Sequence, residues 1–163
     1  MTVVLYRVDE RLIHGQVVVG WGNELRPDRY VVVDDVVAGS EWEQELYHLG
    51  LPAGVGVDFL EVGEARERLP ALEEDERRIL LLTRDVETML RLARGGLLDG
   101  QRVNIGGVHH AEGRERVRPW LHLDDADRER IRELGREGVT VSGRDLPGSA
   151  RVGVDSMLGG SGS

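Results

Sequence analysis

Two residue types are missing from this chain of 163 residues: it contains neither cysteine nor lysine, so all 21 of its basic residues are arginine. Without cysteine there is no disulfide, no thiolate catalysis and no cysteine-based zinc site. Without lysine there is no Schiff-base chemistry and no phosphate-binding loop of the kind that needs an invariant lysine. These absences remove several large classes of enzyme and metal site.

Aromatic residues are also scarce, at 4% of the sequence, so the core is expected to consist of Val, Leu and Ile. No apolar run reaches the 18 residues that a membrane-spanning helix requires. Asp9 and Glu10 interrupt the first apolar run, so a secretion signal is not expected. A cytoplasmic protein is the resulting expectation.

The net charge of −9 disfavours nucleic acid as a partner, because phosphates attract clustered positive charge. It equally disfavours adhesion to an anionic membrane surface. The length and the mixture of 40% hydrophobic and 31% charged residues are typical of one globular domain. That domain is predicted to span residues 1–158, followed by a flexible Gly/Ser tail at 159–163.

Short apolar runs alternate with helical patterns along the chain. Strands are predicted at residues 3–6, 30–33, 55–62, 79–82, 103–105 and 139–141, with a short edge strand at 117–123. Helices are predicted at 15–24, 40–50, 63–72, 85–93 and 124–136, the second of them opened by a capping box of Ser40 and Glu43. This alternation indicates an α/β fold of one domain, a mainly parallel open sheet with helices on both faces.

Ligands of open parallel sheets bind beyond the carboxyl ends of the strands. Polar and glycine residues gather at those ends here, and the rim is expected to include Asp34, Thr83, Gly106 and Gly107. At least one of Asp34 and Asp35 is expected to cap or orient the loop that contains His14. Gly106-Gly107 is expected either to form a turn or to let the backbone approach a bound group. No G-x-G-x-x-G follows a strand, so dinucleotide binding has no support.

The loop after the first strand contains the most informative residue, His14. It lies where a helix begins, so free N–H groups and the helix dipole favour an anion there. Gly15 allows close backbone approach, and the guanidinium of Arg11 can grip phosphate oxygens. Neutral imidazole is a nucleophile near pH 7. The alternative is that His14 is an ordinary loop residue and that Arg11 pairs with a neighbouring carboxylate.

The stretch RVDERLIHGQV closely resembles the phosphorylation-site motif of the IIB components of the mannose/fructose/sorbose class of the sugar phosphotransferase system. The segments YVVVDD, LPAGVGVDFLEV, MLRLARGG and NIGGVHHAEGR are similar to the same family in the same order, over about residues 2–155. Two departures stand out: Glu10 replaces the usual Asp, and Thr83-Arg84-Asp85 replaces a segment that contains Asn-Pro.

The resemblance implies a phosphocarrier. His14 would accept a phosphoryl group from a IIA protein and transfer it to a sugar delivered by the membrane components IIC and IID. By the same resemblance Arg11 would steady the phosphoryl group, Asp9 would hold the loop in shape, and Gly15 and Gln16 would border the phosphate. No metal and no cofactor is implied, and the protein would work at the inner face of the membrane. A monomer and a homodimer both stay open, as do a stand-alone regulatory phosphocarrier and a ligand-binding module on the same fold.

Overall fold

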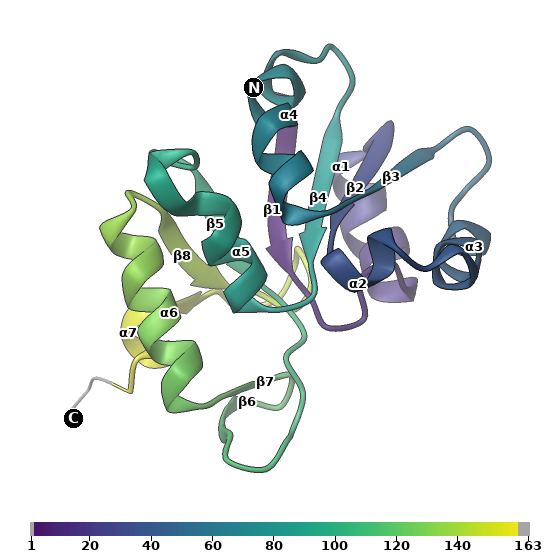
Figure 1. The fold of residues 1–163 in the computed structure, drawn as a ribbon. Helices are drawn as coiled ribbons and strands as arrows, with labels where there is room; N and C mark the ends of the chain where they lie inside the picture. Colours follow the sequence, from purple (N-terminus) through teal and green to yellow (C-terminus); the bar gives the residue numbers. More distant parts are fainter. Residues whose placement is uncertain (1, 160–163) are drawn as a thin grey trace.

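A seven-stranded sheet forms the centre of the protein, whose computed structural model describes residues 2–159 (Figure 1). Residues 160–163 of the predicted tail therefore lie outside the described residues. The strand order is β3-β2-β4-β1-β5-β8-β9, and every neighbouring pair is parallel except β8 and β9. The strands are β1 (Val3–Val8), β2 (Arg29–Val33), β3 (Gly56–Leu60), β4 (Ile79–Thr83), β5 (Arg102–Ile105), β8 (Thr140–Gly143) and β9 (Val152–Gly153). The predicted, mainly parallel α/β sheet is confirmed.

The central strands are largely apolar because both of their faces are covered, as is usual in parallel sheets. In β4, Leu80 and Leu82 belong to the core on the side of Trp21, whereas Ile79 and Leu81 belong to the core on the side of Met89. All of these side chains are buried. Successive side chains of a strand point to opposite faces of the sheet. Because both faces of β4 are buried, its sequence is an unbroken apolar run.

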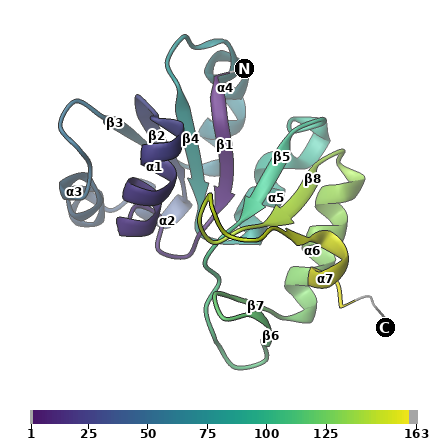
Figure 2. The ribbon, with the colours of Figure 1, turned by 180° about the vertical axis from the view of Figure 1, so that it is seen from behind.

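Helices cover the two faces of the sheet unequally (Figures 1 and 2). On one face lie α4 (Val62–Glu74), α5 (Val86–Ala93) and α6 (Asp125–Arg136); on the other lie the π-helical turn η1 (Gln16–Trp21) and α1 (Gly22–Leu25). The remaining helices are α2 (Asp35–Ala38), α3 (Glu41–Leu49), η2 (Arg94–Gly96) and α7 (Val154–Met157). Within residues 2–159 none of these helices has the length and apolar character needed to cross a bilayer.

Three details differ from the sequence-based expectations. Residues 117–123 do not form one edge strand; they contribute to a separate hairpin of β6 (Glu115–Arg118) and β7 (Leu121–Leu123). Pro119 lies in the turn between them, because proline cannot donate a ladder hydrogen bond. Ser40 precedes α3 but its side chain forms no capping hydrogen bond. The short elements α2, β9 and α7 were not expected from the sequence.

The register of the sheet brings three loops to one edge. Val8 at the end of β1 pairs with Thr83 of β4 on one side and with Ile105 of β5 on the other. The segments that follow these three strands therefore leave the sheet side by side. This edge holds the residues on which the functional prediction depends.

Candidate functional site

The loop between β1 and η1 is fixed to both neighbouring strand ends. Asp9 N donates to the carbonyl of Thr83 at 2.9 Å, and Glu10 N donates to the carbonyl of Gly107 at 2.9 Å. Leu12 then adopts φ 56°, a left-handed conformation that costs a residue with a Cβ about 1–2 kcal/mol. Its side chain is fully buried, and burial of a leucine offsets that cost. The loop is therefore held in one shape before any partner arrives.

Asp9 is the centre of this loop. Its Oδ1 lies 3.0 Å from Nε2 of His14 and accepts a hydrogen bond from the backbone N of Arg11 at 3.2 Å, while its Oδ2 accepts from Nη2 of Arg7 at 3.1 Å. Burial opposes ionisation of Asp9, but the contacts with His14 and Arg7 outweigh it and hold its pKa below the usual range. The carboxylate is therefore charged, and it orients the His14 ring.

Arg7 lies beneath Asp9 and has no exposed surface. Besides Asp9, its guanidinium donates to the side-chain oxygen of Asn104 and to the carbonyls of Arg144, at 2.8 Å, and Asp145, at 3.1 Å. The same guanidinium lies 5.0 Å from the ring centroid of Trp21, within cation–π range. The sequence analysis gave Arg7 no role, although an arginine in a buried strand two residues before an aspartate is a signal for a buried ion pair.

His14 keeps a limited opening to solvent. Its side chain is 13% exposed, yet Nε2 is buried, 3.0 Å from Oδ1 of Asp9 but without the geometry of a hydrogen bond. The exposed surface must therefore belong to the rest of the ring, where Nδ1 is the other nitrogen. Nε2 therefore faces the protein, and any nitrogen that a partner could reach on this ring is Nδ1.

Arg11 and Gly15 border that opening. Nη2 of Arg11 donates to Oε1 of Gln16 at 3.0 Å, both residues are exposed, and no ion pair within the described residues involves Arg11. The alternative pairing of Arg11 with Asp9 or Glu10 through its guanidinium is not found. A Cβ on Gly15 would meet no atom within 4 Å, so there is open space beside His14. A cationic fork next to open space suits an incoming anion.

The four predicted rim residues lie at this edge but are engaged within the protein. The expectation that Asp34 or Asp35 holds the His14 loop is wrong. Asp34 caps α2 by accepting from Val36 N and Val37 N, and its Oδ2 lies 3.4 Å from Nε of Arg84, while Asp35 accepts from Val62 N and pairs with Arg91. Thr83 is buried and donates through its hydroxyl to the carbonyl of Asp85 at 2.9 Å.

The two glycines shape the floor of the loop. A Cβ on Gly106 would overlap the Arg7 guanidinium, and the backbone N of Gly107 lies 3.5 Å from Oδ2 of Asp9. Gly106 and Gly107 thus make room for the Arg7–Asp9 pair. Contact between a phosphate and any of Gly106, Gly107, Asp34 and Thr83 stays a prediction.

A second network beside the loop was missed by the sequence analysis. Oε2 of Glu10 lies 3.1 Å from Nδ1 of His109 and accepts from its backbone N at 3.0 Å, and Oε1 accepts from Nη1 of Arg114 at 2.6 Å. Burial raises the pKa of Glu10, but the hydrogen bonds from His109 and Arg114 outweigh it and lower that pKa overall. These contacts fix the β5–β6 loop to the His14 loop. Within residues 2–159 no three His, Asp or Glu residues are grouped as metal ligands would be.

Comparison with known proteins gives consistent results. Residues 3–162 match the family model described as the PTS system sorbose subfamily IIB component. The chain is 34% identical to the N-acetylgalactosamine-specific phosphotransferase enzyme IIB component 1 of Escherichia coli, over 91% of this chain and 94% of that protein. It is 30% identical to the mannose-specific EIIAB component of the same species, over 90% of this chain and 45% of that longer protein. Among solved structures, the IIBSor domain of the sorbose permease of Klebsiella pneumoniae superimposes with a TM-score of 0.86 at 25% identity, covering 98% of each chain.

Proposed function

The chain belongs to the sorbose subfamily of the IIB components of the sugar phosphotransferase system, and on this premise we propose that His14 is the residue that carries the phosphoryl group. Components of this family accept phosphate from a IIA protein and transfer it to a sugar. The observation that carries the proposal is the pairing of a buried, ionised Asp9 with one nitrogen of a partly exposed His14.

The reacting atom in this proposal is Nδ1. With Nε2 facing the Asp9 carboxylate at 3.0 Å, the neutral ring keeps its proton on Nε2 and its lone pair on Nδ1. Asp9 also stabilises the positive charge that the ring gains when Nδ1 forms a bond. It acts through the imidazole and does not touch phosphorus, so Asp9 is a positioning residue.

The transfer proceeds in two balanced steps. Nδ1 first attacks the phosphorus of a phosphohistidine on the IIA donor; a new N–P bond forms, and the bond to the donor breaks with its electron pair returning to the donor imidazole. The oxygen of a sugar hydroxyl then attacks the same phosphorus and gives up its proton to a base of the sugar-binding partner or to water; the N–P bond breaks, with its electron pair returning to Nδ1 of His14. Both steps pass through a loose, in-line transition state, so alignment and charge stabilisation supply the catalysis. Arg11 provides that positive charge from beside the opening.

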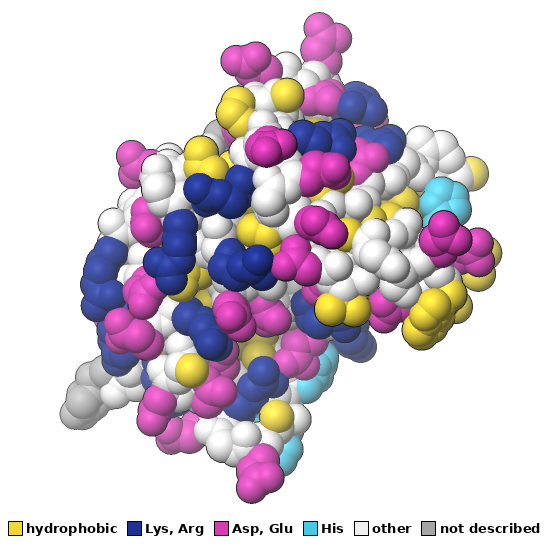
Figure 3. All heavy atoms as spheres, viewed as in Figure 1, with side chains coloured by type: hydrophobic (Ala, Val, Ile, Leu, Met, Phe, Trp, Pro, Cys, Tyr) yellow, Lys and Arg dark blue, Asp and Glu magenta, His cyan; other side chains and the backbone are white. Residues whose placement is uncertain are grey.

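The donor's docking surface, in this proposal, extends from His14 onto α3. None of the residues of this helix is buried, and Trp42 is 66% exposed and Leu46 57% exposed. Both line one hollow with Ile13, the residue before His14, so a partner in contact with His14 is next to them. Figure 3 shows hydrophobic side chains at the surface over α3 beside acidic ones.

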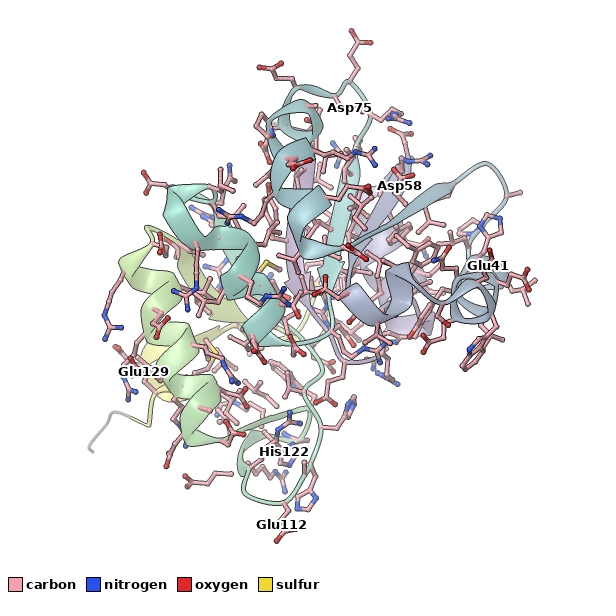
Figure 4. All side chains as sticks on the ribbon, viewed as in Figure 1. Glu41, Asp58, Asp75, Glu112, His122 and Glu129 are labelled. Atoms are coloured by element: carbon pink, nitrogen blue, oxygen red, sulfur yellow. The ribbon has the colours of Figure 1, made fainter. Side chains whose placement is uncertain are left out.

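Charge favours the IIA donor over the membrane as the occupant of this surface. The first turn of α3 carries Glu41 and Glu43, and Figure 4 shows Glu41 at the outer end of the helix. Acidic side chains are repelled by the anionic inner leaflet. We propose that the protein is cytoplasmic and approaches the membrane through its IIC and IID partners. The choice of sugar belongs to those partners in this proposal.

Intact-mass measurement after incubation with a phosphorylated IIA donor tests the proposal. The protein is expected to gain one acid-labile phosphate, and the His14→Ala variant none. A variant that still gains the phosphate would overturn the assignment of His14. Formation of sugar phosphate with membranes that contain IIC and IID then separates the transporter role from a purely regulatory phosphocarrier, and absence of any phosphorylation would leave only the ligand-binding alternative.

A further inference from the structure

The sheet carries a second group of basic residues away from the His14 loop. Seen from behind, β5 and β8 stand in front of α5 and α6, and among the described residues no helix covers their middle on this side (Figure 2). In the sheet, Asn104 of β5 pairs with Arg7 of β1 on one side and with Ser142 of β8 on the other. These three residues form a polar row across the three strands. Arg7 in this row is fully buried, whereas Asn104 and Ser142 are half-buried. Partly exposed polar side chains are unusual on a parallel sheet, whose faces are normally buried.

A hollow lies on this polar stretch. Its lining consists of Leu5, Trp21, Arg102, Val103, Asn104, Ser142, Arg144 and Arg151, and its volume is about 140 Å³. Three of the eight lining residues are therefore arginines. Pockets for drug-sized ligands begin at roughly 300 Å³. The hollow is smaller than that, so it is too small for a nucleotide and has room for a single small anionic group.

The three arginines of the hollow have no acidic partner. Among the ion pairs of residues 2–159, none joins Arg102, Arg144 or Arg151 to a carboxylate, although acidic residues outnumber basic ones by 30 to 21 in the sequence. The one hydrogen bond found for the guanidinium of Arg144 within residues 2–159 is to the carbonyl of Pro147, at 3.1 Å. The nearby Asp145 acts electrostatically on Arg7 and is not part of the lining. The hollow thus keeps an uncompensated positive charge.

The floor of the hollow supplies neutral donors. Oδ1 of Asn104 is taken by the Arg7 guanidinium, so the Asn104 side chain has its amide NH₂ left to donate. The hydroxyl of Ser142 is a second donor in the lining. Arginine forks together with amide and hydroxyl donors are the groups that recognise phosphate oxygens.

We propose that this hollow is a second anion-binding site, which takes the phosphoryl group of a small phosphate ester such as a sugar phosphate. The ligand would contact Asn104 on the side opposite to its bond with Arg7. Because Arg7 also pairs with Asp9, which faces His14, the bound anion would lie one buried ion pair away from the phosphorylation loop. The site does not depend on His14 being phosphorylated.

Titration of the ¹⁵N-labelled protein with glucose 6-phosphate, inorganic phosphate and uncharged glucose tests this proposal by NMR. At constant ionic strength, glucose 6-phosphate is expected to bind with saturation and to shift amides of β5 and β8, whereas glucose is not. Saturable binding of inorganic phosphate alone would identify the free ion as the ligand and overturn the ester assignment. Saturation by neither anion at millimolar concentration would overturn the site itself.

Two variants locate the binding. Arg102→Gln with Arg151→Gln, both exposed positions, is expected to weaken binding by about tenfold or more, since two charge-assisted contacts are lost. His14→Ala is expected to bind with unchanged affinity. Loss of binding in His14→Ala, with retention in the double variant, would place the anion at the His14 loop and contradict the proposal while leaving the proposed phosphocarrier function intact.

Discussion

Oδ1 of Asp9 lies 3.0 Å from Nε2 of His14, and the other oxygen of the same carboxylate accepts a hydrogen bond from the fully buried Arg7. One carboxylate thus links a partly exposed imidazole to a guanidinium in the core. This relationship explains why an ionised aspartate is kept out of water. It neutralises Arg7 and, in the proposed function, sets the tautomer and direction of the His14 ring.

Asp9→Asn is expected to destabilise the protein by about 3 kcal/mol or more, because it leaves the buried Arg7 charge uncompensated. Urea unfolding measures the free energy of unfolding directly. Asp35→Asn is the matched control: Asp35 pairs with Arg91 on the surface, with side chains 45% and 47% exposed, and such a pair contributes below about 1 kcal/mol. Equal losses in the two variants would show that Arg7 does not need Asp9.

The stability provided by Asp9 should depend on pH with a definite sign. Because the pKa of Asp9 is lowered in the folded protein, its contribution is fully present above the ordinary aspartate pKa of about 3.9 and is lost as the pH falls through the lower folded value. The gap in unfolding free energy between the wild type and Asp9→Asn should therefore be constant near neutrality and shrink below about pH 4. Unfolding curves over that range check it, and a gap that persists in full at about pH 2 would contradict the assigned shift.

Gly106→Ala is expected to disturb the Arg7 site, since its Cβ would overlap a guanidinium that is fixed by four acceptors. Overpacking of this kind costs about 1–3 kcal/mol, and the rate of phosphorylation should fall with it. Gly135→Ala, in α6 with no atom within 4 Å of its Cβ position, is expected to stabilise the protein by up to about 1 kcal/mol. Thermal unfolding and phosphorylation assays compare the two, and an unperturbed Gly106→Ala variant would mean that Arg7 can move freely.

Arg11→Gln is expected to lower the rate of phosphoryl acceptance by about a hundredfold, because it removes the cation beside the reacting group. The Arg11 side chain is exposed and forms its hydrogen bond with Gln16, so stability should change little. Rapid-quench kinetics with the phosphorylated IIA donor measure the rate, and Arg11→Lys, which keeps the charge without the fork, should recover part of it. A normal rate in Arg11→Gln would assign the charge stabilisation to another residue.

Trp42→Ala is expected to weaken productive encounter with the IIA donor by about tenfold or more, as truncation of an aromatic anchor commonly does. The control is Leu49→Ala, which removes an exposed apolar side chain from the same helix but outside the hollow shared with Ile13. The dependence of the transfer rate on donor concentration separates the two variants. If Trp42→Ala instead dissociated a dimer seen by size-exclusion chromatography, the α3 surface would be a homodimer contact.

Much of the fold could be predicted from the sequence, because most strands of the central sheet contain a short apolar run and the helices α3, α5 and α6 begin or end at a cap or a glycine. The helix α4 has neither, since it lies between Glu61 and Asp75. Asp85 and Asp124 do cap α5 and α6, with hydrogen bonds to Thr88 N and Asp127 N. The hairpin at residues 115–123 was not anticipated, since a strand pattern of that length does not reveal that Pro119 turns the chain back on itself.

The candidate site was only partly accessible to sequence reasoning. Asp9, Arg11, His14 and Gln16 are close along the chain, so local spacing was sufficient to group them. Arg7 forms its further bonds with residues near positions 104 and 145, and Glu10 with His109 and Arg114; these contacts depend on strand order, which no local pattern encodes. The same holds for the arginine-lined hollow, whose residues come from opposite ends of the sequence.

The most direct test of the central claim is NMR of the ¹⁵N-histidine-labelled protein after phosphorylation by the IIA donor, with the ³¹P coupling read at each ring nitrogen. The account predicts a single phosphohistidine, at Nδ1 of His14, with Nε2 still protonated toward Asp9. A phosphoryl group found on Nε2 of His14, or on any of the other four histidines, would contradict it.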